Sequence, residues 1–144
     1  MLMNSGEYIA TMEKVFQEIR SAQYRATQQV NSELVLLYHS IGCMINTHKE
    51  WGNKFIDNLA ADIRREFPGS KGYSVRNLKH MAKFAEAYPD REFVQTVSAQ
   101  IPWSHNLAIL DKVESPEERI WYIQKTTENG WSYNVLIHQI ESKL

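Results

Sequence analysis

Apolar residues recur at intervals of three and four positions along most of this 144-residue chain. That spacing places them on one face of an α-helix, whereas a half-buried strand would alternate polar and apolar residues. No stretch alternates in that way, and the four prolines and six glycines fall mostly at the ends of the helical stretches. We therefore expect an all-α, multi-helix fold, with room for a small β-wing between helices.

The first 50 residues contain the two longest amphipathic stretches, and we expect helices at about residues 7–25 and 27–49. Two long helices in succession are typical of an α-hairpin or of part of a bundle, and they would equally serve as a dimer surface. The apolar positions of the first stretch are Tyr8, Met12, Val15, Phe16, Ile19 and Ala22. Residues 1–144 are read as one domain, with this long helical pair at 1–50 and a compact part at 51–144.

Capping signals divide the compact part into shorter helices. We expect them at residues 53–67, 74–88 and 91–100, then starting at Ser104, Ser115 and Ser132. Three of the starts share the order aromatic, serine, asparagine, aliphatic: Tyr73 to Leu78, Trp103 to Leu107 and Trp131 to Leu136. This repeat is either one cap-and-staple solution used three times or a shared functional surface.

A glycine-rich turn followed by a basic helix dominates the middle of the chain, at residues 69–84. Ser74 is a good N-cap, and Tyr73 and Leu78 are spaced to form a hydrophobic staple around it. The cations of this helix fall largely on the side opposite to its apolar residues. A short, capped, basic-faced helix after a turn is typical of the second helix of a helix-turn-helix, which we place at 53–88.

Charge is unevenly distributed. The net charge is −1, but between Arg64 and Lys83 there are six cations and one anion, a local balance of +5. A local basic patch on a near-neutral protein favours a specific docking site for nucleic acid. The candidate nucleic-acid-binding residues are Arg64, Arg65, Lys71, Ser74, Arg76, Asn77, Lys79, His80 and Lys83. One alternative is that the basic face is simply solvated. Another is that the patch is structural, with its arginines tied up by Asp57, Asp62, Glu66 or Glu86.

Catalytic and cofactor motifs are missing from the sequence. Cys43 is the only cysteine, and no two of the five histidines have the spacing that puts two metal ligands on one helix face. Glu141-Ser142-Lys143 has the Glu-x-Lys form of metal-dependent nucleases, but it ends an expected helix instead of lying on a strand. We expect no cofactor, no metal and no enzymatic activity. With no signal-peptide pattern and no apolar run of roughly 20 residues, we expect a cytoplasmic protein.

Several motifs together resemble the helical N-terminal domain of the YhcG-type bacterial proteins. The resemblance rests on the segments 31–38, 41–42, 51–54, 67–68, 71–78, 101–106, 121–122, 128–132 and 139–142, together with Met81 and Phe84. In that family the domain usually precedes a nuclease domain of the PD-(D/E)XK type, so the resemblance implies a role in DNA metabolism. The sequence stops at Leu144, where the nuclease domain would follow, so no catalytic residue is carried over. His39 stands where the resemblance would place an aromatic such as tryptophan.

Two hypotheses follow. The first is a DNA-binding module that targets a nuclease in the same polypeptide or in trans, with Arg76 and Asn77 as the candidates for reading bases and the other cations on phosphates. The second is a protein-interaction or oligomerisation module without nucleic-acid affinity. In that case the N-terminal helices would supply a homodimer interface, with a partly exposed Trp51 at its edge.

Overall fold

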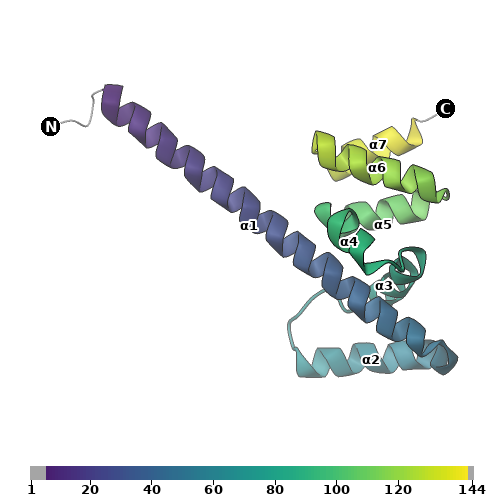
Figure 1. Ribbon diagram of the computed structural model, residues 1–144. Helices are drawn as coiled ribbons and strands as arrows, with labels where there is room; N and C mark the ends of the chain where they lie inside the picture. The colour runs from purple at the N-terminus through teal and green to yellow at the C-terminus, as the bar shows by residue number, and fades with distance from the viewer. Residues whose placement is uncertain (1–5, 143–144) are drawn as a thin grey trace.

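The computed structural model describes residues 6–142, and within this range the fold is all-α, with seven α-helices, two short 3-10 helices and no strand (Figure 1). The elements are α1 (Gly6–Thr47), η1 (Lys49–Trp51), α2 (Gly52–Glu66), α3 (Val75–Ala87), α4 (Arg91–Thr96), η2 (Ser98–Gln100), α5 (Trp103–Lys112), α6 (Pro116–Asn129) and α7 (Tyr133–Glu141). The all-α prediction is confirmed, and the described part of the chain contains no β-wing.

The expected pair of N-terminal helices is wrong, because residues 6–47 form the single 42-residue helix α1. Between Gly6 and Gly42 there is no glycine or proline to interrupt the helix. At the expected break, the Thr27 hydroxyl donates to the carbonyl of Gln23 at 3.1 Å, a bond within the helix. Figure 1 shows the first half of α1 extending clear of the other helices, which gather around its second half.

Helix α3 lies at the centre of the compact part and makes its most extensive contacts with α1. Its side chains enter both hydrophobic clusters: Phe84 belongs to the cluster formed with Val35 of α1 and residues of α4 to α7, whereas Leu78 and Met81 belong to the cluster formed with residues of α1 and α2. The two helices approach closely at Gly42, where an added Cβ would overlap the carbonyl oxygen of Met81. With this face buried, α3 leaves its opposite face to solvent.

Local capping signals place most helix starts correctly. Ser74, Ser115 and Ser132 each cap a helix, with side-chain oxygens accepting from the amides of residues 77, 118 and 135 at 3.1, 3.4 and 3.2 Å. The prediction for Ser104 is wrong: α5 begins at Trp103 after Pro102, and no side chain caps it. Because Ser104 is already inside the first turn, its hydroxyl is not at the position that a cap requires.

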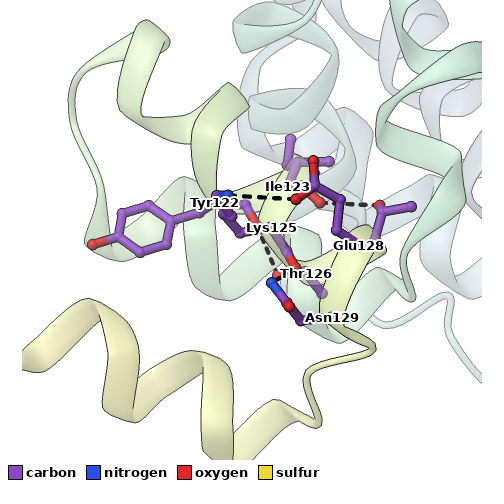
Figure 2. Close-up of polar contacts among 7 residues, drawn as sticks. Tyr122, Ile123, Lys125, Thr126, Glu128 and Asn129 are labelled. Atoms are coloured by element: carbon purple, nitrogen blue, oxygen red, sulfur yellow. Dashed lines mark hydrogen bonds and ion pairs between the residues drawn. The ribbon is translucent and has the colours of Figure 1, made fainter.

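Polar side chains near the end of α6 form hydrogen bonds and an ion pair within the same helix, as Figure 2 shows. The hydroxyl of Thr126 donates to the carbonyl of Tyr122 at 2.7 Å, and Asn129 donates to the carbonyl of Lys125 at 2.9 Å. Lys125 also pairs with Glu128 at 3.4 Å. Gly130 then ends the helix in the left-handed conformation, with φ 61°. Because these groups already bond to each other and to the helix backbone, they offer little hydrogen-bonding capacity to a ligand.

His39 packs in the core, although the family resemblance led us to expect an aromatic residue there. Arg91 Nη1 lies 3.0 Å from His39 Nδ1 and can only donate, so Nδ1 accepts and Nε2 donates to the carbonyl of Tyr88 at 2.7 Å. The imidazole also meets the ring of Phe84 edge-on at 5.9 Å. It therefore fills an aromatic position while joining α1 to the start of α4.

Candidate nucleic-acid interface

The loop before α3, residues 67–74, is attached to α1 through Tyr38. Gly72 has φ 99°, and a Cβ placed on it would lie 2.5 Å from the Tyr38 hydroxyl oxygen. Tyr38 meets the ring of Tyr73 edge-on at 6.1 Å and that of Trp103 at 5.0 Å. The glycine at position 72 is therefore needed both for its conformation and for this close approach.

Asn77 has a structural role that the sequence did not indicate. Its side-chain nitrogen donates to the Gly72 carbonyl at 2.6 Å, and its oxygen accepts from Trp103 Nε1 at 3.0 Å. Both ends of the amide therefore join the loop and α5 to α3. The sequence contained no signal for the Trp103 contact, because the two residues are 26 positions apart and on different helices.

The exposed face of α3 presents three cations. Arg76, Lys79 and Lys83 lie at steps of three and four residues, which puts them on one side of the helix, and all three are exposed. Within residues 6–142 none of them forms an ion pair. The expected competitor Glu86 pairs instead with Lys49, at 2.8 Å. The guanidinium and the two ammonium groups are thus available to an external anion.

His80 lies on the same side of α3 but is half-buried. Burial lowers the pKa of its imidazole, and the charges of Arg76 and Lys83 add to this shift, while Asp111 opposes it. His80 is therefore neutral at neutral pH, and it adds a hydrogen-bonding group to the face without adding charge.

The remaining candidates lie before α3. Arg64 and Arg65 occupy the last turn of α2, where cations also interact favourably with the helix dipole. Arg65 pairs with Asp62 at 3.1 Å, and both side chains are exposed, so this pair is weak. Arg64 and the exposed loop residue Lys71 form no ion pair in the described part of the chain. In the described part of the chain most of the candidate arginines therefore have no acidic partner, which argues against the alternative that acidic residues tie them up.

The connection between α2 and α3 is longer than expected. It spans residues 67–74, eight residues, whereas the turn of a helix-turn-helix has about three or four. The described geometry is therefore helix–loop–helix, and its equivalence to the DNA-binding motif stays a prediction. The three-fold aromatic-serine-asparagine repeat forms no shared surface, because Asn106 is 1% exposed and bonds to Ser98 in the core.

Comparison with known families decides what kind of domain this is. The family model of the DUF1016 N-terminal domain matches residues 14–144. The chain belongs to that family. The resemblance to the YhcG-type N-terminal domain is thereby confirmed, and DUF1016 N-terminal domains are the N-terminal parts of nuclease-associated proteins. Comparisons with curated proteins and with solved structures give no significant match.

Other sites proposed for this DUF1016 N-terminal domain can be placed on the same structure. Glu141 of the nuclease-like string ends α7 and pairs with Lys112 at 3.6 Å, whereas Lys143 lies outside the described residues. Residues 6–142 contain no cluster of three potential metal ligands, and no helix in that range has the length and apolarity to cross a bilayer. Trp51 is exposed as expected, with its ring stacked on His48 at 3.9 Å.

Proposed function

We propose that this DUF1016 N-terminal domain is a DNA-binding module that targets a PD-(D/E)XK-type nuclease domain, present in the same polypeptide or supplied in trans. The observation that carries the proposal is the set of three exposed cations on one face of α3, none of which forms an ion pair with any residue from 6 to 142. Membership of a nuclease-associated family supports the choice of DNA as the anion. In this proposal the domain binds without catalysing, and it acts in the cytoplasm.

Each residue has a distinct part in the proposed complex. Lys79 and Lys83 bind phosphates along one strand of double-stranded DNA, and Arg76, near the start of α3, reaches base edges or a phosphate. Arg64 and Lys71 bind phosphates further out, and Arg65 joins them by exchanging Asp62 for a phosphate, since an exposed ion pair contributes only about 0–1 kcal/mol.

Three candidates act without charge. The neutral His80 supplies a hydrogen bond, and Ser74 holds the start of the helix in place. Asn77 positions the loop instead of reading bases, because Gly72 and Trp103 occupy both ends of its amide. The base-reading role expected for Asn77 is therefore not carried into the proposal, and Arg76 alone keeps it.

The test is binding to a labelled mixed-sequence duplex over a range of salt concentrations. Arg76→Ala/Lys79→Ala/Lys83→Ala removes the cations of α3, and Lys14→Ala/Arg20→Ala/Lys54→Ala is the matched control with the same change in net charge. The control residues are exposed and lie on α1 and α2. Circular dichroism confirms that both variants remain folded.

We expect the parent protein to bind with a log–log salt slope of about −4 to −5, corresponding to about five phosphate contacts. The α3 variant should lose most affinity, with a slope smaller by about 1.8 for the phosphate contacts of Lys79 and Lys83, or about 2.7 where Arg76 also binds a phosphate, while the control variant changes little. Absence of binding by the folded parent protein at low salt would refute the proposal. Equal losses in both variants would show that net charge matters and that the face of α3 does not.

A second candidate function is a protein-interaction or oligomerisation module without nucleic-acid affinity. The observation that favours it is the row of apolar side chains exposed along α1, including Val15, Phe16 and Ile19 at 44–49%. The same binding assay separates the two functions, because only the DNA-binding module responds to the substitutions in α3.

A further inference from the structure

The first half of α1 carries an apolar face that the compact part of the molecule does not cover. Ile9, Val15, Phe16 and Ile19 are each 44–49% exposed, whereas all the buried residues of α1 lie between Val35 and Ile45. The backbone hydrogen bonds of a helix give it little net stability in water, and most helical stability in proteins comes from packing of the apolar face. The projecting half of α1 lacks that packing. Covering this face would therefore stabilise the first half of α1.

The compact part lies on the other side of the helix. Ser32, His39 and Asn46 are spaced seven residues apart, and each donates from its side chain to a backbone carbonyl of the compact part: Ala99 at 2.9 Å, Tyr88 at 2.7 Å and Ala82 at 2.8 Å. At about 100° per residue, Ile19 points about 160° away from His39. The apolar face is thus open to a second helix without obstruction by the molecule's own core.

The spacing on this face is that of a coiled-coil seam. Met12, Val15, Ile19, Ala22 and Ala26 follow one another at steps of three, four, three and four, the a and d positions of a heptad. We propose that this segment of α1 pairs with the same segment of a second copy of the chain. The two helices run antiparallel and are related by a two-fold axis that passes between Arg20 and Ser21 of each helix.

Size complementarity selects the antiparallel direction. About that axis, Ile19 faces the partner's Ala22 and Val15 faces the partner's Ala26, so these two large side chains each meet a small one, while Met12 faces the partner's Gln29 at the end of the seam. On one flank of the seam, Ile9 faces the partner's Val30, which is itself 58% exposed. A parallel pair would instead place alanine on alanine at positions 22 and 26 and leave voids there.

Charge complementarity selects the same arrangement. On the other flank of the antiparallel seam, Glu18 faces the partner's Arg25, and symmetry creates this pair twice. In a parallel pair, Glu18 would face the partner's Gln23, and Arg25 would face the partner's Val30, which offers neither residue a counter-charge. Opposite charges flanking a seam are what sets orientation in paired helices.

The antiparallel pair also has room for both compact parts. The helices overlap over about residues 6–35, and the two Gly42 positions then lie about 65 Å apart along the axis, at 1.5 Å per residue. Where the partner's helix still overlaps α1, at residues 32–35, the compact part contacts α1 through Ser32, on the side opposite to the seam. The inference does not depend on DNA binding, because the face of α3 takes no part in the pair.

The experiment measures the mass of the full chain by light scattering during size exclusion, at concentrations from about 10 to 100 μM. We expect twice the chain mass of 16.8 kDa. Val15→Asp/Ile19→Asp places charges in the seam and should return the mass to that of a monomer. Ala10→Asp/Gln17→Asp, on the opposite face of the same helix turns, is the matched control and should remain dimeric.

A charge-swap series tests the direction. Glu18→Arg and Arg25→Glu each turn two attractions into two repulsions, and each should weaken dimerisation by about 3- to 30-fold. The double variant Glu18→Arg/Arg25→Glu recreates both pairs and should restore the parent constant. A monomeric parent at 100 μM overturns the inference. A Val15→Asp/Ile19→Asp variant that remains a dimer overturns it as well. If the double charge-swap variant dimerises as weakly as the single variants, the antiparallel register is wrong.

Discussion

Replacing Gly42 by alanine tests the close packing of α1 on α3. The added Cβ would overlap the carbonyl of Met81 and lie 2.9 Å from the Ala85 Cβ, so the obstacle is largely backbone and cannot rotate away. Overpacking a core costs about 1–3 kcal/mol, and we take about 3 kcal/mol because α3 must move as a whole. Alanine recovers about 1 kcal/mol through helix propensity, leaving a net loss of about 2 kcal/mol.

Thermal and urea unfolding followed by circular dichroism measure this loss. For a domain of this size about 2 kcal/mol corresponds to a fall in Tm of roughly 6–8 °C. Gly6→Ala is the control in the same helix, since a Cβ there meets nothing within 4 Å, and its Tm should change little or rise slightly. A Gly42→Ala protein at least as stable as the parent would refute the packing argument, because the overlap with Met81 would then cost no more than the roughly 1 kcal/mol that helix propensity returns.

Two further predictions concern polar groups between helices. Asn77→Ala should lower the free energy of unfolding by about 1–3 kcal/mol, because Trp103 Nε1 and the Gly72 carbonyl lose their partner. Urea unfolding measures this loss, and an unchanged urea midpoint would contradict it. The second concerns pH. Burial lowers the pKa of His39, the bond to the Tyr88 carbonyl opposes this, and the Arg91 charge adds to it. The unfolded chain therefore takes up the proton first, and stability should fall as pH drops below about 6.5. The free energy of unfolding of His39→Gln should fall less than that of the parent over the same pH range. An equal fall in both proteins would contradict the assignment of this pH dependence to His39.

The role of the basic residues was only partly predictable. The steps between Arg76, Lys79 and Lys83 put them on one face of a helix in any fold, so their grouping followed from the sequence. Whether acidic residues would neutralise them depended on tertiary structure, because Glu86 turned out to pair with Lys49, 37 residues earlier in the chain. The neutral state of His80 likewise depends on tertiary structure, because burial is the largest cause of its lowered pKa and outweighs the opposing effect of Asp111 in α5.

Helix ends were determined by the sequence alone wherever the capping groups are neighbours. Ser74, Ser115 and Ser132 each accept from an amide three residues away, and such bonds form in the same way whatever surrounds the helix. Tertiary structure decided what requires contacts between distant segments. The approach at Gly42, the Asn77–Trp103 bond and the open face of α1 all depend on which helix packs where. The long α1 shows the difference: its apolar residues suggested two packed helices, but the compact part covers only the second half.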